Sequence, residues 1–155
     1  MLRTLETGLI DSVQVVYNTF DQSPEDRLFP YCLEHNIAVI ARVPFDEGSL
    51  TGTLTRESRW PEGDFRNLYF TPETLPETLD RVDRLRRDVP EGMTMPELAL
   101  RHILAHPAVS TVIPGMRKIP HVEQNVAVSD MDRLGPEVTD RLKAHRWDRL
   151  PGACG

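Results

Sequence analysis

The chain has 155 residues, of which 39% are hydrophobic and 27% are charged, a composition that suits one soluble globular domain with its own core. Its formal net charge of −6 argues against nucleic acid or an anionic membrane as the main partner, because both reward clustered Lys and Arg. The sequence contains no charged-then-apolar leader and no apolar run long enough to cross a membrane. We therefore expect a cytoplasmic protein.

The apolar residues fall into short runs that alternate with helical periods, the pattern of βαβ units and a parallel sheet. Strands are predicted at residues 12–17, 37–41 and 109–113. Helices are predicted at residues 24–35, 72–87, 94–105, 120–126 and 136–146, before a tail at 147–155. Ser23 is the expected N-cap of the first helix, and Thr94 with Glu97 is the expected capping box of the third. Residues 43–70 show little period, which is typical of a functional or mobile loop.

The strand at 37–41 is apolar on both faces, which predicts helices on each side of the sheet. Three parallel strands make an incomplete sheet, and a closed (β/α)₈ barrel typically takes about 250 residues. The outer strands would present unpaired edges, which are an aggregation liability unless something covers them. Of the two cysteines, Cys32 is predicted to be a small buried hydrophobe in a helix and Cys154 to be exposed in the tail, so no disulfide framework is expected.

The segment from Thr111 to Lys118 carries the strongest local signal for a site. It combines a strand, a turn at Gly115, two cations and then a helix start, a pattern that can bind an anion through backbone N–H groups and the helix dipole. The guanidinium of Arg117 suits a phosphate monoester. An ordinary strand-to-helix connection with solvated basic residues explains the same pattern, and the residues alone leave both interpretations open.

Two further signals lie in the first two predicted strands. Gln14 interrupts an apolar strand, and a buried Gln is costly unless its hydrogen bonds are met, so it either joins a core network or faces a ligand. The second strand delivers Arg42 at its carboxyl end and passes into a loop that contains Gly48 and Gly52. Ligands gather at the carboxyl ends of parallel strands.

Taken in order, these segments resemble the aldo-keto reductase family. The matching residues are Gly8-Leu9-Ile10-Asp11, Gln14, Tyr17-Asn18, Ala41-Arg42-Val43-Pro44-Phe45, Gly48, Leu50-Thr51-Gly52, Leu98-Ala99-Leu100-Arg101, Ile113-Pro114-Gly115-Met116-Arg117 and Glu123-Gln124-Asn125. The resemblance implies a (β/α)₈ barrel that binds NADP(H) across the carboxyl ends of its strands. Residues 1–155 would form the C-terminal part of that domain, its last three strand–helix units, with the N-terminal half absent.

The resemblance also implies a role for each matching residue at the cofactor. Gln14 would hydrogen-bond the nicotinamide carboxamide, and Arg42 would lie flat against a ring where many members place an aromatic side chain. Phe45, Gly48 and Leu50 would lie along the pyrophosphate. Gly115, Met116 and Arg117 would surround the adenosine 2′-phosphate, with Gln124 and Asn125 near the adenine.

Some members of the family carry a Lys at the position of Gly115, and others carry an Arg at the position of His121. Arg117 would therefore carry most of the recognition of the 2′-phosphate. The catalytic Asp, Tyr, Lys and His of the family come from earlier segments that match nothing here, so no catalytic residue is assigned. Tyr17 matches the sixth-strand motif and not the catalytic tyrosine. His102 and His106 are four residues apart but have no third ligand, so no metal site is expected.

Two functions of different classes follow from the sequence. The first is a segment of an NADP(H)-dependent oxidoreductase, whose complete form would bind a nicotinamide cofactor and a small aldehyde or ketone, and which is inactive as this chain alone. The second is a non-catalytic binding or assembly protein derived from the same barrel. In either case we expect self-association or a complementing N-terminal half to cover the sheet edges. Another phosphate-binding barrel enzyme is disfavoured by the Gln-x-x-Tyr-Asn strand.

Overall fold

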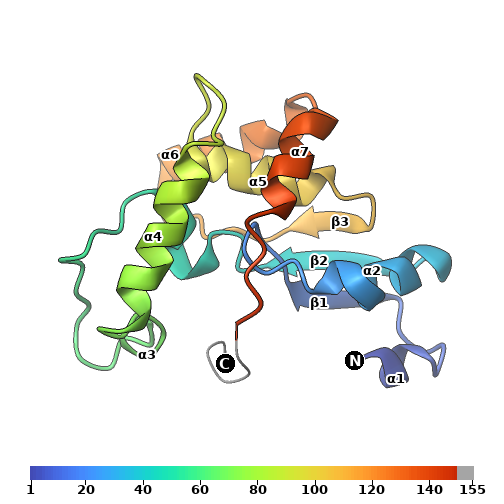
Figure 1. The fold of residues 1–155 in the computed structure, drawn as a ribbon. Helices are drawn as coiled ribbons and strands as arrows, with labels where there is room; N and C mark the ends of the chain where they lie inside the picture. The colour runs from blue at the N-terminus through green and yellow to red at the C-terminus, as the bar shows by residue number, and fades with distance from the viewer. Residues whose placement is uncertain (150–155) are drawn as a thin grey trace.

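A computed structural model describes residues 1–149, which form a three-stranded parallel sheet packed against helices (Figure 1). The strands are β1 (Ser12–Val16), β2 (Ala38–Arg42) and β3 (Val109–Val112), in the spatial order β1-β2-β3. Both pairings are parallel, with a register irregularity at Val39/Ile40 between β2 and β3. The three predicted strands and their parallel arrangement are confirmed.

The helices alternate with the strands as βαβ units require. They are α1 (Leu2–Leu5), α2 (Pro24–Glu34), η1 (Asp46–Thr51), α3 (Arg66–Tyr69), α4 (Thr74–Arg86), α5 (Met95–Ala105), α6 (Ile119–Ala127), η2 (Val128–Asp130) and α7 (Pro136–Lys143). The five predicted helices are present within a few residues, although α7 ends at Lys143 and not at Arg146. The short elements α1, η1, α3 and η2 were not predicted, because they are too brief to show a hydrophobic period.

The two predicted N-caps differ in the structure. Thr94 accepts a hydrogen bond from the backbone N–H of Glu97 at 3.2 Å, which is one half of the predicted capping box; the Glu97 carboxylate pairs with Arg101 instead of completing it. Ser23 does not cap α2 through its side chain; its Oγ donates to Asp21 at 2.8 Å. The start of α2 therefore depends on Pro24 at its first turn and on the acidic residues that follow.

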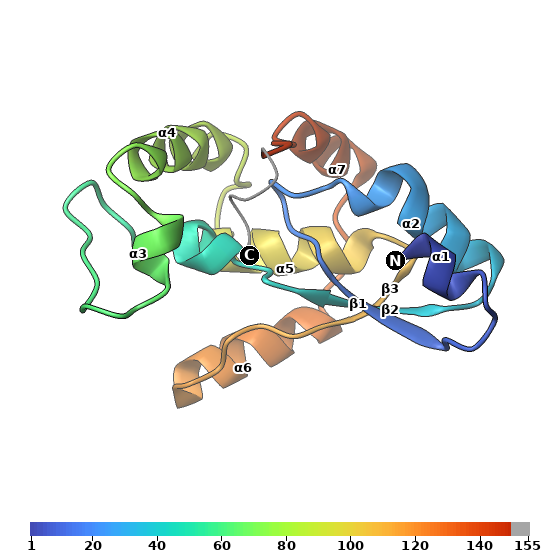
Figure 2. The same ribbon diagram turned by 90° about the horizontal axis from the view of Figure 1, so that it is seen from below.

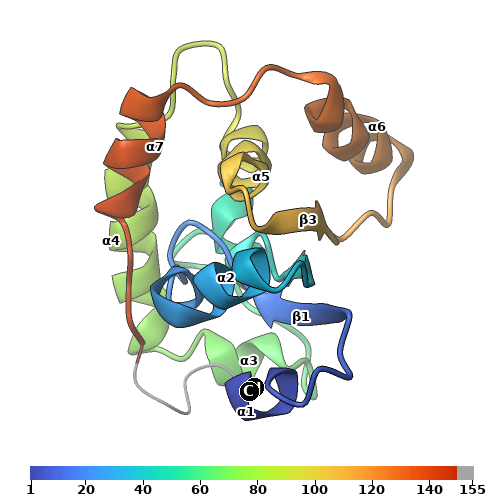
Figure 3. The same cartoon turned by 90° about the vertical axis from the view of Figure 1, so that its right-hand side faces the viewer.

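One face of the sheet forms the main core. Val13, Val39 and Ala41 are buried there and pack with Phe29 of α2 and Ile103 of α5. Figure 3 shows α2 and α5 on this side of the sheet, with α4 and α7 farther out on the same side. Cys32 belongs to this core and is a free, buried thiol, as predicted, whereas Cys154 lies outside the described residues.

The opposite face, which we call the open sheet face, corrects the expectation of helices on both sides of β2 and excludes a core network for Gln14. Gln14, Ile40 and Thr111 share it in register across the three strands. Among residues 1–149 no helix lies across it; α6 contacts α5 and η2 beyond the β3 edge (Figure 3). Helices therefore cover one side of β2 and not both. Gln14 is exposed and not buried, because side chains alternate along β1 and Val13 takes the core side.

His102 is a buried histidine inside α5. It is 2% exposed, and neither ring nitrogen has a hydrogen-bond partner among the described residues. Burial, with smaller contributions from His106 and His145, lowers the pKa of His102 to about 4. Its ring lines a cavity of about 280 Å³ beside Tyr17 and Glu25. His102 is therefore a packed histidine, and the described part of the chain contains no group of three or more His, Cys, Asp or Glu that could hold a metal ion.

The stability of the chain should fall as the pH drops from about 6.5 toward 4, because the unfolded state protonates His102 there while the folded state keeps it neutral. The shift from 6.5 to about 4 corresponds to about 3 kcal/mol at most. His102→Leu should flatten this dependence in urea titrations at fixed protein concentration. His35→Gln, at an exposed position on α2's carboxyl end, should leave it unchanged. An equally steep loss in His102→Leu would refute the assignment.

No helix within residues 1–149 has both the length and the apolar character needed to span a bilayer.

Candidate functional site

A cleft of about 1130 Å³ lies at the carboxyl ends of β2 and β3. The loops that follow these two strands leave the sheet at the same end (Figure 2) and form two of its walls. A third wall comes from the segment before α3. The cleft is lined by Val43, Pro44, Phe45, Glu47, Gly48, Thr51, Thr53, Leu54, Gly63, Asp64, Phe65, Arg66, Ile113, Gly115, Arg117, Lys118 and His121. Two segments that the sequence singled out separately therefore meet in one cavity.

The wall after β2 has an unusual backbone. Val43, Asp46 and Glu47 have φ angles of 57°, 47° and 55°, in the left-handed region that non-glycine residues seldom adopt, and Gly48 has a φ of 110°. Such strain is largest for a β-branched residue such as Val43. It persists only where the surroundings fix the conformation, and it gathers at functional sites.

Asn18 is one of the groups that fix this loop. Its side chain is fully buried, and Nδ2 donates to the carbonyl oxygen of Val43 at 3.0 Å. Its Oδ1 accepts hydrogen bonds from the backbone N–H groups of Phe20 and Asp21, both at 2.9 Å. The Tyr17-Asn18 pair belongs to the family motif in the sequence. Only the structure shows that the Asn18 side chain links the segment after β1 to the loop after β2.

The wall after β3 brings Gly115 and Arg117 to the cleft. Gly115 is exposed, and a Cβ added to it would meet no atom within 4 Å, so the turn leaves space beside the backbone. Asn125 of α6 lies next to it, with Nδ2 3.5 Å from the Gly115 carbonyl oxygen. Arg117 and Lys118 are both exposed at the cleft rim. This end of the cleft can hold an anionic group through two cations.

The third wall carries charges that the sequence did not reveal. Arg66 forms a bidentate ion pair with Asp64, with Nε–Oδ1 at 2.9 Å and Nη2–Oδ2 at 2.6 Å. The hydrogen bonds from Arg66, with a smaller contribution from Arg117, lower the pKa of Asp64 to about 2. Burial raises the pKa of Glu47, and the neighbouring Asp46 carboxylate raises it further. The surrounding arginines act in the opposite direction and lower this pKa. The cleft therefore presents Arg66, Arg117 and Lys118 around two carboxyl groups.

The other predicted site residues lie outside the cleft lining. Gln14 and Arg42 lie on the open sheet face, on neighbouring strands. Leu50 is fully buried in a core cluster with Phe20 and Leu98, so its side chain packs and does not face the cleft. Met116, Gln124 and Asn125 belong to the turn before α6 and to α6 itself; Met116 is 43% exposed, Gln124 is exposed and Asn125 is half-buried.

Tyr17 is part of the core and not of the cleft. It is 1% exposed, and its O–H donates to Glu25 at 2.6 Å. Burial and the Glu25 carboxylate raise the pKa of Tyr17 far above its usual range. A phenol in this setting is a poor proton donor to a ligand, in keeping with its match to a strand motif and not to a catalytic tyrosine.

The fold is a three-stranded parallel α/β unit with a cleft at the carboxyl ends of β2 and β3, the edge at which ligands gather in parallel sheets. Residues 2–146 match the aldo/keto reductase family, and the chain belongs to that family. The family identified from the sequence motifs is thereby confirmed.

The curated relatives are longer proteins. The chain is 32% identical over 136 residues to the uncharacterized oxidoreductase YqkF of Bacillus subtilis (88% of this chain, 43% of that protein). It is 26% identical to the NADH-specific methylglyoxal reductase of Escherichia coli (87% and 42%), and 29% identical to the aldo-keto reductase yakc [NADP(+)] of Schizosaccharomyces pombe (75% and 36%). The chain thus spans less than half the length of these relatives, of which the second is named for NADH and the third for NADP(+).

The solved structure of the glycerol dehydrogenase AKR11B4 from Gluconobacter oxydans superimposes with a TM-score of 0.78. It is 22% identical, and the match covers 92% of this chain and 45% of that one. This likeness shows that the three-stranded sheet and its helices share the fold of part of that longer chain.

Proposed function

We propose that the chain is the C-terminal part of an NADP(H)-dependent aldo-keto reductase, its sixth to eighth strand–helix units, and that its cleft binds the cofactor. The convergence of residues 43–48 and 113–118 on one cleft carries this proposal. The cleft, of about 1130 Å³, offers room for a dinucleotide. Its cations suit phosphate groups, and the space beside Gly115 allows a ligand to approach the backbone.

In this proposal Arg117, with Gly115 and Met116, holds the 2′-phosphate, and Gln124 and Asn125 of α6 flank the adenine. Phe45, Gly48 and the backbone of Leu50 follow the pyrophosphate. On the open sheet face, Gln14 hydrogen-bonds the carboxamide of the nicotinamide, and Arg42 lies flat against a ring of the cofactor. When bound, NADPH would supply the hydride that reduces an aldehyde or ketone in the complete barrel. The residues of this chain bind and orient the cofactor, and the proton donor comes from outside the chain.

Fluorescence titration of the 155-residue chain with NADPH and NADH at one fixed salt concentration tests this proposal. We expect NADPH to bind roughly 10- to 150-fold more tightly, because its 2′-phosphate gains charge-assisted hydrogen bonds at the rim. The preference should shrink as the salt concentration rises. Equal affinities would contradict the NADP assignment, and binding of neither cofactor would contradict the whole proposal.

A second candidate is a non-catalytic assembly protein, favoured by the apolar side chains that the chain leaves exposed. Ile119, Val122 and Val126 form a stripe on α6 and are 74%, 40% and 55% exposed. Together with the open sheet face they would pack against another copy of the chain or against a complementing N-terminal half. An assembly protein of this kind has no use for a nicotinamide cofactor, so the same titration separates the two candidates.

A further inference from the structure

Asp46 carries a fully buried carboxylate at the start of η1. Arg149 binds it in a bidentate pair, with Nη1–Oδ1 at 2.6 Å and Nη2–Oδ2 at 2.9 Å. The hydroxyl of Ser49 donates to Oδ2 at 2.6 Å, and the hydroxyl of Tyr69 donates to Oδ1 at 2.7 Å. The negative charge of Asp46 is therefore fully satisfied by groups from three segments of the chain.

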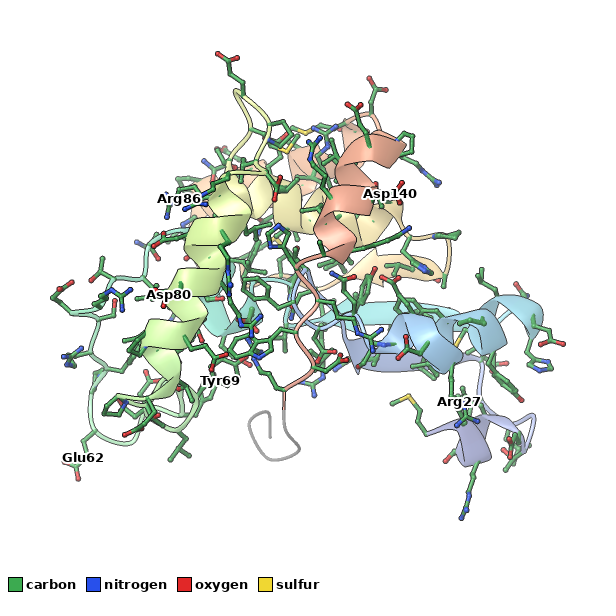
Figure 4. The ribbon with its side chains drawn as sticks, viewed as in Figure 1. Arg27, Glu62, Tyr69, Asp80, Arg86 and Asp140 are labelled. Carbon is green, nitrogen blue, oxygen red and sulfur yellow. The ribbon has the colours of Figure 1, made fainter. Side chains whose placement is uncertain are left out.

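Arg149 reaches Asp46 because residues 147–149 pack against the segment after β1 and the loop after β2. The backbone N–H of Trp147 donates to the carbonyl oxygen of Phe20 at 2.7 Å. The Arg149 guanidinium then lies 4.1 Å from the centroid of the Trp147 ring and 5.2 Å from that of Tyr69. Figure 4 shows the Tyr69 side chain beside this C-terminal segment. The predicted tail therefore begins as a packed segment over residues 147–149.

This ion pair joins two walls of the cleft. Asp46 sits between Phe45 and Glu47, which line the cleft, inside the run of positive φ angles. Tyr69 belongs to α3, which begins at Arg66 in the third wall. Arg149 itself does not line the cleft, so it can act on a ligand only through these walls.

A buried carboxylate that loses its partner is strongly destabilising, and a left-handed backbone persists only while its surroundings fix it. Removal of Arg149 would leave the buried Asp46 carboxylate without a cationic partner within the strained loop. The loop could then restore solvation to Asp46 only by moving, which would displace Phe45, Glu47 and Gly48 from the cleft wall.

We propose that Arg149 is a positioning residue, which holds residues 43–48 through Asp46 in the conformation that binds the pyrophosphate side of a dinucleotide. The C-terminal segment would thus set the affinity of the cleft without touching the ligand. The positioning role stands on the loop geometry, whereas its effect on NADPH rests on the proposed function.

Amide hydrogen exchange on the 155-residue chain tests the positioning role directly. The backbone N–H groups of Gly48 and Leu50 donate to the Phe45 carbonyl at 2.8 and 3.1 Å, so their exchange reports on this loop. Arg149→Ala should speed their exchange about tenfold or more. The double variant Asp46→Asn/Arg149→Ala leaves no buried charge and so controls for general unfolding. Its exchange should still be faster than in the unmodified chain, because the tether is lost, but slower than in Arg149→Ala, because no unpaired charge drives the loop to move.

Arg146→Ala is the matched control. Arg146 lies in the same C-terminal segment and forms a bidentate pair with Asp26 of α2, with both N–O distances at 2.6 Å. Its removal should leave the exchange of Gly48 and Leu50 unchanged. Unchanged exchange in Arg149→Ala would overturn the inference, whatever the ligand measurements give.

Ligand affinities then distinguish positioning from general damage. Arg149→Ala should raise the Kd for NADPH about tenfold and leave the Kd for 2′-AMP unchanged, because 2′-AMP reaches only the Arg117 end. Arg149→Lys should fall between, since Lys keeps the charge but not the fork. Equal losses for both ligands would overturn the inference. If the unmodified chain binds neither ligand, the proposed function fails and the exchange result alone decides the role of Arg149.

Discussion

Arg117→Ala is expected to weaken NADPH binding roughly 10- to 150-fold and to leave NADH binding almost unchanged. Arg117 is a basic side chain that the turn after β3 brings to the rim of the cleft. A charge-assisted hydrogen bond of this kind contributes about 1.5–3 kcal/mol, which corresponds to that range of affinities. Only the phosphorylated cofactor carries the group that this bond recognises. Fluorescence titrations with both cofactors at one salt concentration measure the effect.

Two variants serve as controls for Arg117→Ala. Lys118→Ala, at the neighbouring rim position, should show a smaller loss with the same preference for NADPH. Arg3→Ala removes an exposed cation of α1, which does not line the cleft, and should change neither affinity. Equal losses for NADPH and NADH in Arg117→Ala would mean that Arg117 serves the fold or the shared pyrophosphate, and its assignment to the 2′-phosphate would be wrong.

The purified 155-residue chain is expected to show no measurable reduction of aldehydes or ketones by NADPH. General acid catalysis alone typically contributes roughly 10²- to 10⁴-fold. Among residues 1–149, no tyrosine lines the cleft. The hydroxyl of Tyr17 donates a hydrogen bond to Glu25 in the core, and the hydroxyl of Tyr69 donates one to Asp46. The rate of NADPH oxidation with a panel of small aldehydes measures the outcome.

An absence of NADPH oxidation is informative only if the cofactor is bound to the chain during the assay. The assay should therefore use NADPH concentrations above the Kd from the titration. His121 lines the cleft and is the one imidazole among its lining residues, so His121→Asn belongs in the same series. Turnover well above the background, whether or not it is lost in His121→Asn, would contradict the expectation that this chain lacks a proton donor.

The sequence by itself determined the family and the local elements of the chain. Apolar runs at 12–17, 37–41 and 109–113 became β1, β2 and β3 within one residue at most ends, because β-branched runs bounded by turn residues specify strands locally. The Thr94–Glu97 pair set the start of α5 through a hydrogen bond between near neighbours. The strand positions and this helix start both depend on interactions between residues a few positions apart, and such interactions can be recognised in a sequence pattern.

The tertiary structure alone decided which predicted residues share a site. The sequence leaves Gln14 either in a core network or facing a ligand, and the choice depends on which sheet face the helices cover, which no residue near Gln14 encodes. The third cleft wall, with Asp64 and Arg66, lies in a segment with no hydrophobic period. Asp46 and Arg149 are 103 positions apart, so their pairing has no local signature. Contacts over such separations form only when packed helices bring the segments together. That packing depends on side chains from the whole sequence, so no short segment specifies it.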